Sequence, residues 1–395
     1  MTSKLEELIA KLCPNGVEYK KIGDIGKVSM CKRILKNQTN PVGDIPFYKI
    51  GTFGKKADSF ISNKLFHEYK QKYSFPNKGD ILISAAGTIG RVVVYDGEPA
   101  YFQDSNIVWV ANDEKKILNS FLYYIYQLEP WKVSSGGTIS RLYNENIAGA
   151  TIPVPPLEVQ EEIVRILDTF TELTAELTAE LTARKKQYEY YRDTLLTFDD
   201  NNPLHSLISR YCLNGVEYKK IGDIATLSRG KVMSKSFIND NSGEYPVYSS
   251  QTENNGQFGA ISTYMFDGKY VTWTTDGANA GTVFYRDGKF SVTNVCGVID
   301  ISDCQVDTKY VYYALTIHAK NYVSSGMGNA KLMSNVMSKV TIPVPPLEVQ
   351  RQIVQILDRF DALCNDLTQG LPAEIEARRK QYEYYRDQLL TFKRA

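Results

Sequence analysis

Residues Leu157–Phe198 read LEVQEEIVRILDTFTELTAELTAELTARKKQYEYYRDTLLTF, and Leu347–Phe392 read LEVQRQIVQILDRFDALCNDLTQGLPAEIEARRKQYEYYRDQLLTF. In the first stretch, mostly apolar residues from Ile163 to Phe198 recur at alternating steps of four and three, which is typical of a coiled-coil seam. At 1.5 Å per residue, such a helix would be roughly 60 Å long. A lone helix with one apolar stripe needs a partner, so the two stretches are predicted to pack together.

The rest of the chain repeats around these helices. NGVEYKKIGDI occurs at residues 15–25 and 214–224, TIPVPPLEVQ at 151–160 and 341–350, and QYEYYRD at 187–193 and 381–387. The second block is thus shifted by 341 − 151 = 190 residues and the third by 381 − 187 = 194. The chain is predicted to be two tandem half-units, each a globular part followed by a long helix.

The two helical stretches differ in the region between the matched blocks. TAEL occurs twice in the first, at Thr174–Leu177 and Thr178–Leu181, and the second has 194 − 190 = 4 more residues here. An insertion of four residues into a heptad pattern is a stutter that unwinds the coil. Gly370 and Pro372 lie in the insertion. Because proline inside a helix costs about 3 kcal/mol, the second helix is predicted to be bent or interrupted there.

Composition limits the class of protein. The net charge is +1, but residues 1–156 hold 20 Lys/Arg against 15 Asp/Glu, whereas 157–199 hold 5 against 10. The globular parts suit a modest polyanion-binding surface. The 6 cysteines and 3 histidines show no metal-ligand spacing, which favours a reduced, metal-free protein. No apolar run suggests a membrane span or signal peptide, so we expect a cytoplasmic location.

The globular parts show strand-like runs rich in β-branched and aromatic residues, broken by Gly and Asn/Asp. Each run of strands is followed by a helical pattern, at Ile117–Trp131 and at residues 308–323. We therefore predict mixed, mostly β globular parts with a helix covering each. The expected domains are 1–156, the helix 157–199, a second globular domain 200–346, and the helix 347–395.

Taken together, the tandem halves, the IPVPPLEVQ entry into a long helix, the TAEL repeats and the GDILIS…GTIG and YPVYSSQ…NG elements resemble the specificity (S) subunit of type I restriction-modification systems. The resemblance covers nearly the whole chain. It implies an α+β protein with two target-recognition domains in tandem and two long antiparallel coiled-coil helices, related by a pseudo-two-fold internal repeat. Each domain would read one half of a split, asymmetric DNA site.

The resemblance also implies which chemistry this chain lacks. The S subunit has no catalytic residues, and its helices dock two methylation subunits that motor-nuclease subunits join. S-adenosylmethionine is expected on the methylation partner, and ATP with Mg on the motor-nuclease partner. We expect no cofactor on this chain. From the residues themselves, a rigid helix pair that separates two readers should set the gap between the half-sites.

Loops between the strands should offer polar side chains to base edges and phosphates. At each position the alternative is a solvated loop residue or a turn former. In the first domain we predict DNA contacts from Lys32, Arg33, Lys55, Thr88, Arg91, Gln103, Asn106 and Arg141. In the second domain we predict them from Arg229, Lys231, Ser250, Gln251, Asp276, Asn279, Thr293, Asn294 and Lys331.

The tyrosine-rich helix ends are predicted to dock partner subunits, because exposed aromatic and arginine side chains make good interface anchors. The expected anchors lie off the seam, and a larger core with snorkelling arginines is the alternative. These anchors are Tyr190, Arg192, Tyr384 and Arg386.

Two other functions stay open. One is a stand-alone bipartite DNA-binding or coiled-coil scaffold protein. The other is a metal-dependent nuclease, because Asp104 followed by Glu114-x-Lys116 resembles an acidic pair with a lysine. A methyltransferase is disfavoured, since the Asn-Pro pairs at Asn40 and Asn202 lack the second proline and the aromatic residue that hold a flipped base.

Overall fold

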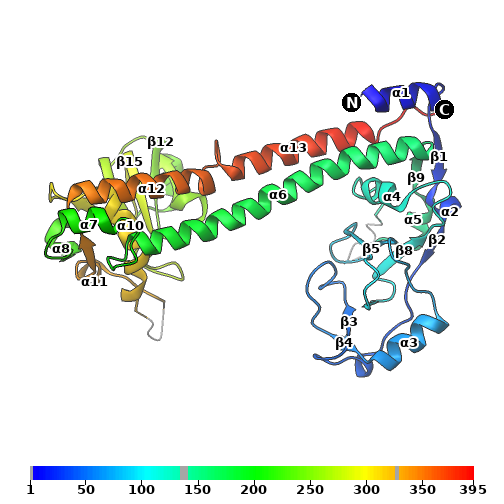
Figure 1. The fold of residues 1–395 in the computed structure, drawn as a ribbon, viewed down its shortest axis with the longest axis horizontal. Coiled ribbons are helices and arrows are strands. Elements are labelled where there is room, and N and C mark those ends of the chain that lie inside the picture. The colour runs from blue at the N-terminus through cyan, green and yellow to red at the C-terminus, as the bar shows by residue number, and fades with distance from the viewer. Residues whose placement is uncertain (1–2, 134–140, 325–328) are drawn as a thin grey trace. The chain divides into compact units, whose positions relative to one another are not determined.

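The computed structural model describes residues 3–133, 141–324 and 329–395 (Figure 1). The chain divides into two compact units. Unit 1 comprises residues 1–177 and 375–395, and unit 2 comprises residues 178–374. Unit 1 therefore draws on segments from both ends of the sequence, while unit 2 is one continuous segment. The domain boundaries expected at residues 156, 199 and 346 stay a prediction.

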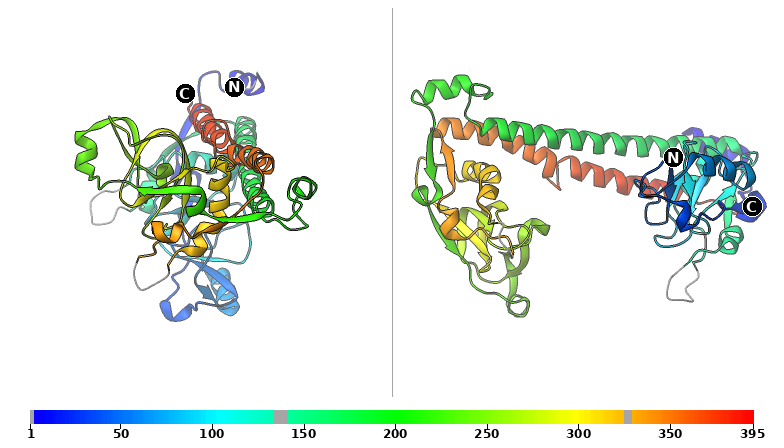
Figure 2. Two further views of the ribbon diagram at one scale, coloured as in Figure 1. Left: turned by 90° about the vertical axis from the view of Figure 1, so that its left-hand side faces the viewer. Right: turned by 90° about the horizontal axis from the view of Figure 1, so that it is seen from below.

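Helix α6 is continuous over 39 residues, Leu157–Leu195. Its first turns lie in unit 1, where Ile163 and Leu167 are completely buried. In each unit the second long helical segment runs antiparallel beside α6 (Figures 1 and 2). In unit 1 the rings of Phe170 and Tyr385 stack with centroids 5.4 Å apart. The predicted seam is therefore an apolar and aromatic contact between helices.

The same contact recurs in unit 2. The ring of Tyr191 stacks on Phe360 at 5.3 Å, and Tyr188 approaches the same ring at 6.5 Å. At the end of α6, Asn202 is buried and its side-chain amide donates to the carbonyls of Thr194 and Leu195, both at 3.1 Å. This amide satisfies carbonyls that a helix end leaves without partners.

The second helical segment is interrupted, as the sequence predicted. Helix α12 ends at Asn365, and helix α13 begins at Leu371. Between them the Asp366 carboxylate accepts from the backbone N–H of Thr368 at 2.7 Å. A Cβ on Gly370 would lie 2.5 Å from a backbone oxygen, so only glycine fits this link. Pro372 then lies in the first turn of α13, where a helix tolerates proline.

Unit 1 contains the sheets β1-β9, β2-β8-β5-β6 and β4-β3-β7, in which β3 and β7 are parallel. The pairing of β1 with β9 joins two of the repeated sequence blocks, with Glu18 opposite Val154. The elements are α1 (Ser3–Leu12), β1 (Glu18–Lys21), α2 (Ile22–Ile25), β2 (Lys27–Ser29), η1 (Lys36–Gln38), β3 (Ile45–Tyr48), β4 (Phe60–Ile61), α3 (Asn63–Lys72), β5 (Ile81–Ser84), β6 (Val92–Val94), β7 (Tyr101–Phe102), β8 (Ile107–Ala111), α4 (Asn119–Tyr126), α5 (Asn144–Gly149), β9 (Thr151–Val154) and part of α13 (Leu371–Leu389).

Unit 2 contains the sheets β10-β17 and β11-β16-β14-β15-β12-β13. Its β10–β17 pair puts Glu217 opposite Val344, which repeats the register of β1–β9. The elements are α7 (His205–Tyr211), β10 (Glu217–Lys220), α8 (Ile221–Ile224), β11 (Ala225–Arg229), α9 (Lys235–Asp240), β12 (Ser242–Tyr248), η2 (Glu253–Gly256), β13 (Gln257–Ile261), β14 (Phe266–Thr274), β15 (Val283–Val292), β16 (Cys296–Ile301), α10 (Thr308–His318), η3 (Ala319–Tyr322), α11 (Ser334–Met337), β17 (Thr341–Val344) and α12 (Leu347–Asn365).

Each unit has a core between a sheet, one covering helix and one long helix. In unit 1, Ile83 of β5, Phe121 of α4 and Ile163 of α6 belong to one buried cluster. In unit 2 the corresponding cluster includes Trp273 of β14 and Ile353 of α12. The covering helices were expected at these places, because their sequences are dense in apolar and aromatic residues.

A buried glutamine fixes the start of each long helix. Gln160 is completely buried and donates to the carbonyl of Pro155 at 2.7 Å. Gln350 is buried in the same way and donates to Pro345 at 2.7 Å. A buried amide is stable only when it is hydrogen-bonded, so these contacts fix the direction in which each helix leaves its globular part. The predicted α+β architecture with a tandem repeat is confirmed.

Candidate nucleic-acid interface

In unit 1 the turn between β7 and β8 gathers several of the predicted DNA contacts. The Arg33 guanidinium donates to the Asp104 carboxylate at 2.9 Å. From the other side, Arg141 donates to the carbonyl of Ser105 at 2.9 Å and approaches the Asn106 amide oxygen at 3.4 Å. Ser105 has a φ of 55°, which shows that the turn is sharp. Two arginines from distant segments therefore meet at one turn.

A depression of about 480 Å³ lies beside this turn. It is lined by Arg33, Gln103 and Asn106, all predicted from the sequence, and by Lys36 and Lys49, which were not predicted. Lys36 lies in a short 3₁₀ helix, and Lys49 directly follows a strand. A run of polar residues between strands does not show which lysines face the same depression, so only the fold could identify these two.

A second group in unit 1 surrounds the hairpin between β5 and β6. Arg91 donates to the carbonyl of Phe53 at 2.7 Å, so its guanidinium is partly used in holding the backbone. The Ser84 hydroxyl donates to the carbonyl of Thr88 at 2.5 Å, while the Thr88 side chain stays exposed. Lys55 is also exposed and follows Phe53 closely in the chain. The Lys32 ammonium lies 5.2 Å from the centroid of the Tyr73 ring.

In unit 2 the polar groups gather around Asp276. Arg229 lies 3.8 Å from this carboxylate and Lys331 lies 3.9 Å from it. Arg229 also donates to Thr275 Oγ1 at 3.2 Å and to the carbonyl of Asn294. One carboxylate thus lies between two cations, and both cations are at least partly exposed. The sequence predicted every residue of this group except Thr275.

The remaining predicted contacts of unit 2 lie in the neighbouring loop Ser249–Gly256 or beside it. Asn279 donates to Thr252 at 3.2 Å, and the Gln251 amide donates to the carbonyl of Gln257, the first residue of β13. Ser250 lies in the same loop and is half-buried. Thr293 is buried, and its hydroxyl donates to Ser249 at 3.0 Å. Thr293 therefore supports the loop from below, while exposed Lys231 forms a β-bridge with it.

The two units hold these groups on the same backbone frame. The N–H of Leu142 donates to the carbonyl of Ala85 at 2.9 Å, and the N–H of Leu332 donates to Thr275 at 2.9 Å. In each unit, the residue before this leucine is a cation that we predicted to contact DNA. These cations are Arg141 and Lys331. One frame therefore presents two different sets of side chains.

The predicted docking residues divide into two kinds. Tyr190 is 64% exposed and Tyr384 is 61% exposed, and each ring packs edge-on against the neighbouring tyrosine. Arg192 and Arg386 are mostly covered and pair with the aspartate that follows each of them, at 2.7 and 2.8 Å. The tyrosines therefore offer free apolar area, whereas the arginines are already engaged.

The residues of the alternative nuclease site have other partners. Asp104 pairs with Arg33, and Glu114 accepts from the backbone N–H of Asn119 at the start of α4, at 2.8 Å. Within residues 3–133, 141–324 and 329–395, no three His, Cys, Asp or Glu side chains group as metal ligands would. Burial raises the pKa of the Cys31 thiol to about 12, so this thiol is protonated at neutral pH.

Two segments, residues 14–184 and 214–377, match the family model described as Type I restriction modification DNA specificity domain. Together they cover well over half of the sequence. Among the parts that the structure describes, no helix is both long and apolar enough to cross a membrane.

Curated relatives point the same way. A Haemophilus influenzae protein named "Putative type I restriction enzyme specificity subunit S.HindORF215P" is 60% identical over 181 residues, which is 45% of this chain and 47% of that protein. The Type I restriction enzyme MpnII specificity subunit of Mycoplasma pneumoniae is 41% identical over 209 residues, 53% of this chain and 62% of the relative. The chain thus spans about half to three-fifths of the length of these relatives.

Solved structures share the fold. The crystal structure of a type I restriction-modification S subunit from M. genitalium aligns with a TM-score of 0.62 and 16% identity, over 95% of this chain and 97% of that one. A chain from a structure of type I R-M complex assembly and conformational transition aligns with a TM-score of 0.56 and 14% identity, over 95% and 98%. At these identities the likeness concerns the fold.

Proposed function

This chain belongs to the family of type I restriction-modification DNA specificity subunits, and from that premise we propose that it selects the DNA sequence on which a methylation complex acts. Each unit reads one half of a bipartite, asymmetric site. The observation that carries this proposal is that the two units repeat one backbone arrangement but present different side chains on it. Unit 1 presents Arg33, Gln103 and Asn106, whereas unit 2 presents Arg229 and Asp276. Different side chains on equal frames should select different bases.

The chemistry of these groups fits base edges and phosphates. Arginine pairs with the O6 and N7 acceptors of guanine, asparagine or glutamine with adenine, and a carboxylate with the amino group of cytosine. Arg33 is paired with Asp104 on one side, yet its side chain is 68% exposed, so it can still turn toward a base. Exposed lysines such as Lys55 and Lys231 suit phosphates, which position a protein on the duplex without selecting sequence.

Partner chains carry out the reaction in this proposal. The long helices fix the gap between the half-sites and dock the methylation subunits, with Tyr190 and Tyr384 as apolar anchors. S-adenosylmethionine then belongs to the methylation subunits, and ATP with Mg to the motor-nuclease subunits. The proposal gives this chain no catalytic residue.

Mapping of methylated adenines tests the proposal directly. Cells that produce this chain with the methylation subunit of its system should carry methylation at one split, asymmetric sequence. Cells that produce the methylation subunit alone are the control and should lack it. A continuous or symmetric methylated sequence would contradict the bipartite reading.

A binding measurement separates the proposal from a stand-alone DNA-binding protein. The purified chain alone and the chain with its methylation subunit are titrated against the mapped sequence and a scrambled one, at one fixed salt concentration. Strong selective binding only in the complex agrees with the proposal. Equally selective binding by the chain alone favours the stand-alone alternative.

A further inference from the structure

Unit 2 contains a buried arginine that the predicted DNA contacts do not include. Arg286 on β15 is 3% exposed. Its Nε donates to Thr272 Oγ1 at 3.1 Å, and its Nη2 donates to the carbonyl of Asn255 at 2.9 Å. The guanidinium carbon lies 3.5 Å from the centroid of the Tyr248 ring and 4.5 Å from that of Phe284. Arg286 is thus held by two aromatic faces and two oxygens.

This arginine lacks the partner that a buried cation normally has. Within the described residues no carboxylate pairs with Arg286, and its Nη1 is buried without a hydrogen-bond acceptor. Burial lowers the pKa of Arg286. A buried, unpaired charge is costly, so its presence calls for a reason other than stability of the sheet.

The contact with Asn255 shows what the arginine holds. Asn254 and Asn255 have φ values of 49° and 52°, and Gly256 follows with 77°. Left-handed backbone is uncommon for residues with a Cβ, so consecutive examples need support from their surroundings. The loop is closed by the Ser249 N–H, which donates to the Gly256 carbonyl at 3.1 Å. Arg286 therefore supports the loop Ser249–Gly256 from beneath at its most strained point.

That loop carries two of the predicted base contacts, Ser250 and Gln251. It is also tied to the rest of the face, because Asn279 donates to Thr252 in the loop at 3.2 Å. The position of these side chains relative to a base edge depends on the loop backbone. A change in the support of the loop should therefore alter which bases unit 2 accepts.

Unit 1 provides an internal comparison. Strand β5 pairs Leu82 with Val93 of β6, and strand β14 pairs Thr272 with Phe284 of β15. Two residues further along, unit 2 has Arg286 and unit 1 has a tyrosine. That tyrosine is Tyr95. The same frame therefore folds with or without an arginine at this position.

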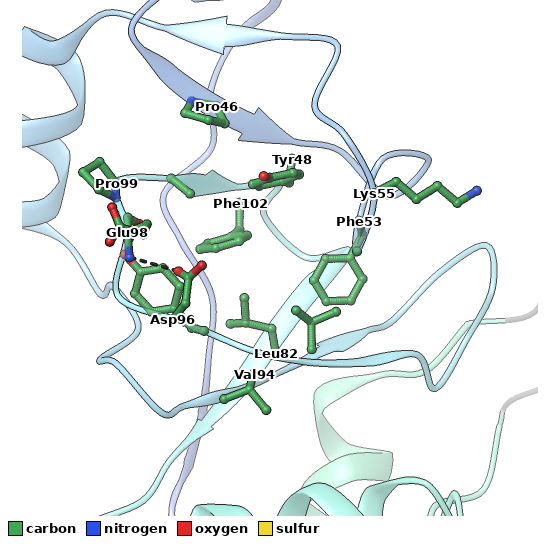
Figure 3. A pocket seen from close by; sticks show the side chains of 14 residues that line it. Pro46, Tyr48, Phe53, Lys55, Leu82, Val94, Asp96, Glu98, Pro99 and Phe102 are labelled. Carbon is green, nitrogen blue, oxygen red and sulfur yellow. Dashed lines mark hydrogen bonds between the residues drawn. The ribbon is translucent and has the colours of Figure 1, made fainter. Parts of the chain in front are cut away.

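Unit 1 has a cavity of about 270 Å³ in this part of its fold (Figure 3). Three residues that line this cavity are equivalent to the three whose side chains touch Arg286. The pairs are Tyr48 with Tyr248, Leu82 with Thr272, and Val93 with Phe284. In unit 1 the corresponding loop is held differently, because the Ile50 N–H donates to the Gln103 side chain at 2.9 Å.

We propose that Arg286 is a positioning residue that fixes the recognition loop Ser249–Gly256 and thereby sets the bases that unit 2 accepts. This inference rests on the proposed function, in which unit 2 reads one half of a split site. Arg286 acts through the loop backbone and does not itself touch DNA.

The test compares methylated sequences in cells that produce the methylation subunit with one of several variants. Arg286→Met removes both hydrogen bonds, and Arg286→Lys keeps the charge but not the planar fork. Tyr95→Phe is the matched control at the equivalent position of unit 1, where it removes only the 2.8 Å hydrogen bond to the Glu98 carbonyl. Gln103→Leu loosens the loop of unit 1 and identifies the half-site that unit 1 reads.

A second pair of variants tests the loop without touching the buried arginine. Asn255 is exposed, so Asn255→Gly and Asn255→Val should both leave the core intact. Glycine adopts left-handed backbone easily, whereas a β-branched residue does not. Only the valine variant should therefore disturb the loop. Equal effects of the two would mean that the Asn255 side chain acts by itself, and would overturn the loop-based inference.

Arg286→Met and Asn255→Val should lower methylation at the native half-site of unit 2 by about tenfold, the size of one mismatched base pair, and broaden the accepted bases there. In these two variants the half-site of unit 1, which Gln103→Leu identifies, should stay unchanged. Tyr95→Phe should match the wild type at both half-sites. Arg286→Lys should give an intermediate loss of methylation. If the wild type already lacks a split site, the proposed function fails. If the wild type has one and Arg286→Met keeps it unchanged, or loses both halves together, this inference fails alone.

Discussion

The hydroxyl of Tyr124 donates a hydrogen bond of 2.5 Å to the Asp168 carboxylate, which connects helix α4 to helix α6 in unit 1. Unit 2 has the equivalent bond from Tyr313 to Asp358, at 2.6 Å. The two bonds lie at corresponding places although the surrounding loops differ in sequence. Both attach the covering helix of a globular part to a long helix, so each should contribute to the stability of its own unit.

Tyr124→Phe should lower the free energy of unfolding by about 1.5–3 kcal/mol, because it removes a hydrogen bond to a charged acceptor. Tyr126→Phe on the same helix is the matched control, since the Tyr126 hydroxyl is buried without a partner among the described residues. Its removal should be neutral or stabilising. Urea unfolding followed by circular dichroism measures both, and equal losses would show that the bond to Asp168 contributes little.

Glu162 predicts an acid-dependent loss of stability. Hydrogen bonds from Arg165 and then Lys4 lower the pKa of Glu162 to about 2. The folded pKa is below the unfolded one, so the contribution is present above the unfolded value of about 4.3 and is lost as the pH falls toward 2. Glu162→Gln should therefore flatten the decline in unfolding temperature between pH 5 and 2. Gln352 occupies the equivalent position in the other repeat, which makes glutamine a natural replacement.

The helix repeats predict a change of spacing. Deleting Thr178–Leu181 shortens α6 by about 6 Å and turns it about 40° beyond a full turn, so the apolar stripe keeps its face. The methylated sequence should keep both half-sites, with a gap shorter by about one or two base pairs. Deleting only Thr178 and Ala179 turns the helix by about 200° and should abolish methylation. An unchanged gap in the first variant would contradict a measuring role for the helices.

The exposed tyrosines predict partner docking. Changing Tyr190 and Tyr384 together to alanine removes exposed apolar area from the long helices. Co-purification with the methylation subunit should fall by at least about tenfold, as expected for interface anchors. Tyr211→Ala is the control, because Tyr211 is 44% exposed but lies on α7, outside the long helices. Retained co-purification in the double variant would point to another docking surface.

Much of the architecture was predictable because it depends on patterns among residues that are close together in the sequence. The seam residues of α6 and the interruption near Gly370 follow from periodicity and from the properties of glycine and proline. The chain repeats also predicted the tandem arrangement. The pairing of β1 with β9 was not predicted, since Glu18 and Val154 are far apart in sequence and no local pattern specifies a strand partner.

The candidate interface was only partly predictable for the same reason. Loop composition predicted Arg33, Asn106 and Asp276. It could not distinguish a hydroxyl group exposed to DNA from one that is buried and holds a loop in place. Thr293 reads as a loop residue in the sequence, and its burial appears only when the loop folds over it. Arg286 was missed because an arginine in a strand normally indicates a solvated face. Its burial depends on rings from separate strands.

The closure of unit 1 by two distant segments has a consequence for synthesis of the protein. The N–H of Val17 donates to the carbonyl of Lys393 at 2.9 Å, and the N–H of Ala395 donates back to Val17 at 3.1 Å. During translation, residue 17 is synthesised early and residue 393 almost 380 codons later. Unit 2 is one continuous segment and can fold during translation. Unit 1 cannot complete its fold until α13 has been synthesised, and part of its core stays exposed until then.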